Sequence, residues 1–158
     1  MPITSADRVF LARAVGLAGN ALAVGDEPFG SVLVSPAGDV LFEDHNHVAG
    51  GDHTRHPEFA IARWAAEHLG PDERRAATVC PSGGRCRMCA AAHGRVGLGR
   101  IVYAMSSAQL TELLASLGAE PGPVAALPVT AIVPGAVVDG PDAELAARVA
   151  ELHRRRFG

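Results

Sequence analysis

The first part of the chain combines one helical and two extended hydrophobic patterns. From Ser5 to about Val24, apolar residues recur at helical spacing, and either Ser5 or Asp7 can cap the start of the helix. The compact apolar segments 31–34 and 40–43 are separated by a short turn that contains proline and glycine. These patterns predict a helix followed by a β-hairpin.

The rest of the chain alternates between helical patterns and single strands. In chain order, we expect a helix from Pro57 to about Leu69, a strand at 77–80, a helix at 86–95, a strand at 100–104, a helix from Ser106 or Ser107 to Leu117, a strand at 128–133, and a final helix capped by Asp142. This order indicates an α/β fold with three layers (α-β-α), in which a five-stranded mixed sheet lies between helices on both faces. No linker or internal repeat divides residues 1–158, so we expect a single domain.

The residues that could carry chemistry are concentrated between positions 56 and 89. His56 stands at the start of one predicted helix, and Cys86 and Cys89 form a Cys-x-x-Cys at the start of the next. The two sulfurs lie one helical turn apart, and the positive end of a helix favours the thiolate form. One imidazole and two thiolates give a tetrahedral Zn²⁺ three protein ligands and leave an open position, which is typical of a catalytic site. We therefore expect zinc as the cofactor.

Glu58 follows the expected histidine ligand by two residues. At that spacing it does not easily bind the same ion, but it can reach the water on the metal. Zinc lowers the pKa of such a water to about 7. The expected role of Glu58 is that of a proton shuttle.

A structural zinc site is the alternative interpretation, and it requires a fourth protein ligand. Cys80, His53 or His93 could supply one. Cys80 falls in a predicted strand, where a small buried hydrophobic residue is the simpler interpretation. His45, His47 and His53 fall in a polar loop, where we expect solvated side chains.

The combination of His-x-Glu with a later Cys-x-x-Cys resembles the zinc-dependent cytidine/deoxycytidylate deaminase-like superfamily, nearest to its guanine deaminase and tRNA adenosine deaminase types. The expected order of helices and strands is also similar to that of this family. The resemblance implies a cytidine deaminase-like fold over residues 1–158. It also implies hydrolytic replacement of an amine on a base by a carbonyl, with release of ammonia, and a homodimer whose subunits complete each other's pockets.

The resemblance extends to a substrate pocket. Phe29 is similar to a residue that commonly lines the base pocket, and Asn46 to one that hydrogen-bonds the base or sugar. Pro57, where relatives usually have alanine, and Ser82 are also expected at the substrate. From the residues alone, Phe29 is equally compatible with core packing, and Asn46 with a turn at the end of a strand. The Glu-Pro that precedes the first cysteine in relatives is missing here, which leaves the substrate open.

Composition and charge narrow the functional class. The chain is 48% hydrophobic and 20% charged, with a net charge of −3, which disfavours broad attraction to nucleic acids or membrane surfaces. No apolar segment is long enough to span a bilayer, and no signal peptide is recognisable. Three cysteines, two of them in a metal-type motif, fit a reducing compartment. We expect a soluble cytoplasmic protein.

Three functions follow from these observations. The leading hypothesis is deamination of a free nucleobase or nucleoside, of guanine or cytosine type, in purine or pyrimidine salvage. The second is tRNA adenosine deamination, for which the only basic clusters are Arg154–Arg156 and the pair Arg85 and Arg87. The third is a non-catalytic, zinc-stabilised subunit, which has no need of Glu58. At the C-terminus, Phe157 is either part of a surface tail or a lid over the site.

Overall fold

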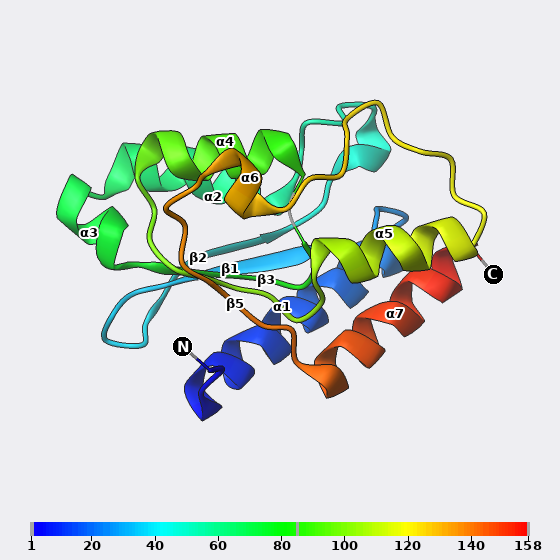
Figure 1. Ribbon diagram of the computed structural model, residues 1–158, viewed down its shortest axis with the longest axis horizontal. Coiled ribbons are helices and arrows are strands. Elements are labelled where there is room, and N and C mark those ends of the chain that lie inside the picture. The colour runs from blue at the N-terminus through cyan, green and yellow to red at the C-terminus, as the bar shows by residue number, and fades with distance from the viewer. Residues whose placement is uncertain (1, 85, 158) are drawn as a thin grey trace.

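The computed structural model describes residues 2–84 and 86–157 and places a five-stranded sheet between two layers of helices (Figure 1). This is the three-layer α/β fold that the sequence predicts. The elements are α1 (Ser5–Ala23), β1 (Gly30–Val34), β2 (Val40–His45), the 3₁₀ turn η1 (Val48–Gly50), α2 (Pro57–His68), α3 (Pro71–Ala76), β3 (Thr78–Pro81), α4 (Arg87–Val96), β4 (Ile101–Val102), α5 (Ser107–Ser116), α6 (Val129–Ile132), β5 (Val138–Asp139) and α7 (Ala143–Phe157).

The sheet is mixed, with the strand order β2-β1-β3-β4-β5. β1 is antiparallel to both of its neighbours, β2 and β3, whereas β3, β4 and β5 run parallel. All residues of β1 are buried, as expected for a strand covered on both faces. β4 is shorter than the predicted strand at 100–104.

Hydrophobic clusters on both faces of the sheet hold the layers together. Because side chains alternate along a strand, Val32 and Val34 of β1 join the cluster that contains Leu11 of α1. Leu33 between them joins the opposite cluster with Ile61 of α2. In Figure 1, α1, α5 and α7 accordingly lie on one side of the sheet and α2, α4 and α6 on the other. Because α2 packs on the sheet, the first residues of this helix have a fixed position relative to the strands.

The fifth strand is not where the hydrophobic pattern predicts it. Residues 129–132 form the short helix α6, and the fifth strand is β5, further along the chain. The apolar residues Val129, Ile132 and Val133 have the spacing of one helical face, and they pack in one cluster with Ala90 of α4 and Ile101. Packing against α4 therefore explains why residues 129–132 form a helical turn rather than a strand.

Two further corrections concern helix boundaries. The N-cap of α1 is Thr4 rather than Ser5 or Asp7. The Thr4 hydroxyl accepts a hydrogen bond from the Asp7 amide (3.1 Å), and the Asp7 carboxylate accepts one from the Thr4 amide (2.9 Å), which is a capping box. α2 ends at His68, close to its expected end, but Pro71 then takes the first position of α3, a helix that the sequence pattern does not predict and in which the missing proline amide would have no helical partner. No helix in the described part of the chain is both long and apolar enough to cross a membrane.

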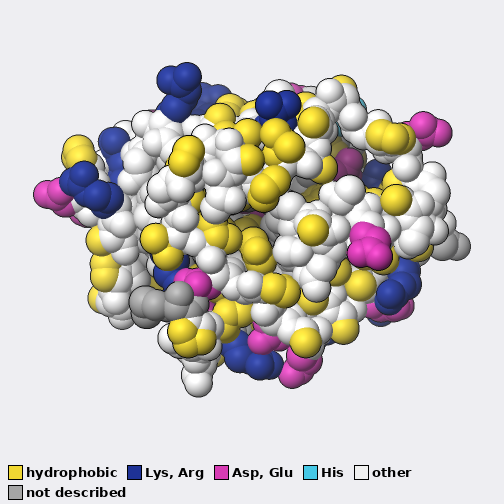
Figure 2. All heavy atoms as spheres, viewed as in Figure 1, with side chains coloured by type: hydrophobic (Ala, Val, Ile, Leu, Met, Phe, Trp, Pro, Cys, Tyr) yellow, Lys and Arg dark blue, Asp and Glu magenta, His cyan; other side chains and the backbone are white. Residues whose placement is uncertain are grey.

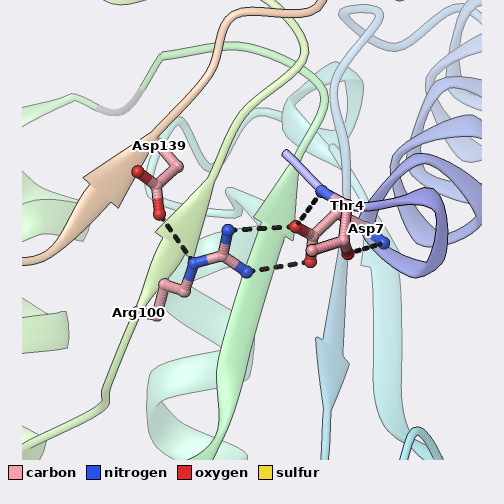
Figure 3. Close-up of polar contacts among 4 residues, drawn as sticks. All are labelled: Thr4, Asp7, Arg100 and Asp139. Carbon is pink, nitrogen blue, oxygen red and sulfur yellow. Dashed lines mark hydrogen bonds and ion pairs between the residues drawn. The ribbon is translucent and has the colours of Figure 1, made fainter. Parts of the chain in front are cut away.

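An ion network joins the start of α1 to the parallel strands (Figure 3). Arg100 donates two hydrogen bonds to Asp7 (2.8 and 3.0 Å) and one to Asp139 of β5 (2.7 Å). The three side chains are only 19%, 11% and 9% exposed. Burial alone would raise the pKa of Asp7, but the hydrogen bonds from Arg100 and Thr4 outweigh it and hold that pKa below its usual value.

Candidate metal centre and active site

Two helix starts meet on the side of the sheet covered by α2 and α4. His56 is the N-cap of α2, and Cys86 is the N-cap of α4. Pro57 occupies the first turn of α2, where a proline fits because its missing amide would have no helical partner. Since α2 and α4 pack against each other, His56 lies beside Cys86 although 30 residues separate them.

His56, Cys86 and Cys89 form a nearly equilateral triangle of donor atoms. The His56 Nδ1 lies 3.5 Å from each sulfur, and the sulfurs lie 3.4 Å apart. None of the three cysteines, all of which lie within the described residues, forms a disulfide. Around a tetrahedral zinc ion, bond lengths of about 2.0 to 2.3 Å place nitrogen and sulfur ligands about 3.6 to 3.8 Å apart. The triangle therefore fits Zn²⁺ with movements of a few tenths of an ångström.

The electrostatics of the triangle also suit a cation. Cys89, and after it His56, lower the pKa of the Cys86 thiol to about 4, against the effect of burial. The Cys89 backbone amide also donates to the Cys86 sulfur (3.5 Å), as expected at a helix N-terminus. The contact with Cys86 in turn raises the pKa of His56. A thiolate beside an imidazole is a donor set that zinc accepts readily.

The residues considered as a fourth ligand lie elsewhere. Among the described residues, the donor group at this position comprises only His56, Cys86 and Cys89. Cys80 is buried in the hydrophobic cluster on the α1 side of the sheet. His93 is buried and bonds through Nε2 to the Gly99 carbonyl (2.8 Å), and His53 is exposed. Three protein ligands and one open position describe a catalytic rather than a structural zinc site.

A cavity of about 200 Å³ opens beside the triangle. Its wall includes Phe29, Asn46, Pro57 and Glu58, together with His56 and Cys86. Glu58, in the first turn of α2, is 5% exposed. The cavity is below the range of about 300 to 1,000 Å³ typical of drug-sized ligands, so it suits a single small ring system.

Ser82 does not line this cavity. Its side chain is fully buried, and the hydroxyl accepts a hydrogen bond from the Gly30 amide (3.1 Å). The Ser82 amide in turn donates to the Gly30 carbonyl (2.9 Å). In the structure, Ser82 extends the pairing of β1 with β3 up to the loop that carries the cysteines.

Asn46 presents one defined half of its amide to the cavity. Its Oδ1 accepts a hydrogen bond from the Val48 amide (3.0 Å). Within residues 2–84 and 86–157, no hydrogen bond engages its Nδ2. An amide fixed in this way offers a hydrogen-bond donor to a ligand. Phe29, another predicted pocket residue, lines the cavity and also contacts the His153 ring edge-on, with the ring centroids 5.0 Å apart.

Several cavity residues were not identified from the sequence. Glu27 lines the wall, and its carboxylate lies 3.8 Å from the guanidinium of Arg156 at the end of α7. The opposite wall consists of α5 and the loop after it, through Ser107, Leu110, Thr111, Leu114 and 124–126. Only the position of Glu27 beside Pro28 and Phe29 could have suggested a role. The apolar face of α5 gives no indication of which neighbour it meets.

The C-terminal end of α7 lies next to this cavity. Arg156 and Phe157 line an adjoining hollow, and Glu27, Phe29 and Leu114 belong to both hollows. The Phe157 side chain is 42% exposed. The end of α7 therefore lies beside the site, as the lid hypothesis requires, and the Phe157 side chain is partly exposed to solvent.

Comparison with known proteins agrees with this geometry. Residues 4–105 match the family described as the cytidine and deoxycytidylate deaminase zinc-binding region. No curated protein sequence matches the chain significantly.

Among solved structures, a guanine deaminase from Nitrosomonas europaea is similar with a TM-score of 0.74 at 16% identity, over 99% of this chain and 87% of that one. A guanine deaminase from Bacillus subtilis has a TM-score of 0.59 at 25% identity, over 80% and 83% of the two chains. A structure from work on A-to-I editing by tRNA:A34 deaminases has a TM-score of 0.64 at 24% identity, over 92% and 99%. The similarities show a shared fold, and the match over residues 4–105 shows that this chain belongs to the cytidine and deoxycytidylate deaminase family.

Proposed function

We propose that the protein is a zinc-dependent hydrolytic deaminase of a free nucleobase or nucleoside, of guanine or cytosine type. The observation that carries the proposal is the buried carboxylate of Glu58 in the same cavity wall as His56 and Cys86. In the overall reaction, water adds to the ring carbon that bears the amine, the carbon–nitrogen bond breaks, and the products are the carbonyl compound and ammonia.

Glu58 is the residue of this chain that moves protons in the proposed reaction. Zinc, when bound by His56, Cys86 and Cys89, acts as a Lewis acid that makes a water available as hydroxide near neutral pH. The Glu58 carboxylate accepts the proton of the attacking water, delivers it to the ring nitrogen next to the reacting carbon, and then assists departure of the amine. Its place in the first turn of α2 keeps it near His56 without making it a ligand.

Two features support a small substrate. The Asn46 Nδ2 is oriented to donate to an acceptor on the base or sugar. Glu27 and Glu58 give the cavity wall two acidic side chains, which disfavour a polyphosphate backbone close to the site. We therefore place purine or pyrimidine salvage, in the cytoplasm, ahead of a role on RNA.

Deamination of adenosine in tRNA is the second candidate. The observation in its favour is the similarity to the tRNA:A34 deaminase structure, which extends over 99% of that chain. A tRNA substrate requires phosphate contacts, and binding that weakens steeply with added salt would support this candidate.

A homodimer is also part of the proposal. Val124 and Val137 are 48% and 55% exposed, and Leu127 is 36% exposed. Hydrophobic side chains also gather in the middle of the face shown in Figure 2, while most of its charged side chains lie nearer the edge. Apolar surface of this kind is typical of contact with another protein. Light scattering of the purified protein gives the mass directly, and a mass of one chain would contradict the dimer.

The decisive experiment measures ammonia release from a panel of bases, nucleosides and tRNA, for the wild type and for Glu58→Ala. We expect Glu58→Ala to keep its zinc and to lose about 10² to 10⁴ in turnover, the usual contribution of a positioned acid–base group. Glu67→Ala, an exposed glutamate on the same helix, is the matched control and should keep full activity. Full activity in Glu58→Ala, or no ammonia from any substrate with zinc-loaded wild type, would overturn the proposal.

A further inference from the structure

A second group of metal-type donors lies outside the cysteine site. One donor atom each from Asp26, His45 and His47 lies within 4.8 Å of the other two. Asp26 belongs to the segment between α1 and β1, His45 ends β2, and His47 precedes η1. The sequence predicts solvated histidines in this loop, but both rings are half-buried and stack with their centroids 4.2 Å apart.

The hydrogen bonds of the two histidines fix which nitrogen is left for a ligand. The His45 Nδ1 lies 2.7 Å from the Asn46 carbonyl, which only accepts, so Nδ1 carries the proton and Nε2 keeps its lone pair. The His47 Nε2 lies 2.8 Å from the Asp44 carboxylate, so the same reasoning leaves the lone pair on Nδ1. Metal-binding histidines almost always donate their other ring N–H to a carbonyl or carboxylate in this way.

Asp26, the third donor, is held in place by a hydrogen bond from the backbone. Asp26 is 7% exposed, and its Oδ1 accepts a hydrogen bond from the Ala49 amide (2.9 Å). Among the described residues, no hydrogen bond is formed by its second oxygen. A nearly buried carboxylate that has one oxygen held by the backbone and lies beside two imidazoles is the usual third member of a nitrogen–oxygen metal site.

We propose that Asp26, His45 and His47 bind a second divalent transition-metal ion through two imidazole nitrogens and one carboxylate oxygen. Two nitrogen donors favour zinc and its first-row neighbours over magnesium or calcium, which take oxygen ligands. The ligands of one such ion lie about 3.3 Å apart, so binding draws the three side chains together. His47 is 33% exposed, which gives the ion a path of entry.

The two histidines flank Asn46, so an ion held by them would tie down the loop that carries this cavity residue. The site itself does not rest on the proposed deaminase activity, because its ligands are separate from His56, Cys86 and Cys89. The two ideas can therefore fail independently.

Metal stoichiometry tests the proposal. Protein stripped of metal is titrated with Co²⁺, and bound zinc is counted separately by elemental analysis after dialysis against Zn²⁺. We expect about two ions per chain for the wild type and about one for His47→Ala and for Asp26→Asn. The ion that these variants retain should still give the thiolate-to-cobalt charge-transfer absorption of the cysteine site, which also shows that they fold. His56→Ala should instead weaken that absorption and keep the second ion.

The matched control is His53→Ala, which removes an exposed histidine from the same loop and should leave about two ions bound. A wild-type stoichiometry of about one overturns the proposal. So does a second ion that His47→Ala and Asp26→Asn both retain.

Discussion

Two clusters of charged or metal-binding side chains lie at opposite ends of β3, and they differ in how completely their members are paired. At the start of the strand, Arg100 lies between two carboxylates and bonds to both. Beyond its end, His56, Cys86 and Cys89 point donor atoms at one another, and the described residues supply no cation between them. The first cluster is complete within the chain, whereas the second is completed by a metal. The two clusters therefore differ in whether every charged group has a partner within the chain, more than in how deeply they are buried.

Removing one donor of the open cluster should have the largest effect. We expect Cys86→Ala to lose zinc from this site and to lower turnover to background, because a nitrogen and one sulfur hold zinc far more weakly than three donors. The matched control is Cys80→Ala, which removes a buried thiol that packs in the core. It should keep its zinc and lose only a little stability. The measurements are zinc content and ammonia release, and retention of zinc by Cys86→Ala would contradict the ligand assignment.

Replacing Arg100, which lies between Asp7 and Asp139, should lower the stability of the protein and leave its activity unchanged. In Arg100→Met, Asp7 and Asp139 remain as largely buried carboxylates that have lost the hydrogen bonds and the positive charge of Arg100, so we expect the free energy of unfolding to fall by about 3 to 5 kcal/mol. Zinc content and turnover of the folded variant should not change. The control is Arg13→Met, which breaks the more exposed pair with Glu43 and should cost at most about 1 kcal/mol.

Denaturant unfolding of both variants provides the comparison. Equal losses of stability in Arg100→Met and Arg13→Met would show that burial of the Arg100 network contributes nothing. A loss of zinc in Arg100→Met would show that the two clusters are coupled through β3.

The cluster of His56, Cys86 and Cys89 could be predicted from the sequence. The cluster of Arg100, Asp7 and Asp139 could not. His56, Glu58 and the two cysteines stand at helix starts at short, fixed spacings, so their chemistry is visible in the residues themselves. Arg100 meets Asp7 across 93 residues, and no local spacing indicates that contact. The same limit explains why Glu27 was missed, since only tertiary packing brings it to the cavity beside Phe29.

The fold was predictable where elements are long enough to carry a pattern. α1, the hairpin, α2 and α7 lie within a few residues of their expected positions. β5 has only two residues, too few for alternation to be recognised, and its place in the sheet follows from pairing with β4. The apolar segment 128–133 before β5 suggests a strand by composition. The spacing of Val129, Ile132 and Val133 instead suits the helical turn that packs on α4.

His153 is a third case: its side chain is buried, and its Nε2 has no hydrogen-bond partner among the described residues. Burial, and after it the charge of Arg156, lowers the pKa of His153 to about 4. Because the unfolded chain binds this proton below about pH 6.5, stability should be complete above that pH and should fall as the pH drops toward about 4, by at most about 3 kcal/mol. Comparing unfolding curves of the wild type and His153→Leu between pH 7 and 4.5 isolates this effect, because groups outside this residue, including Cys86 with its pKa of about 4, contribute in the same way to both proteins. If the difference in stability between the two proteins does not change with pH, His153 keeps its proton in the folded state and must have a partner.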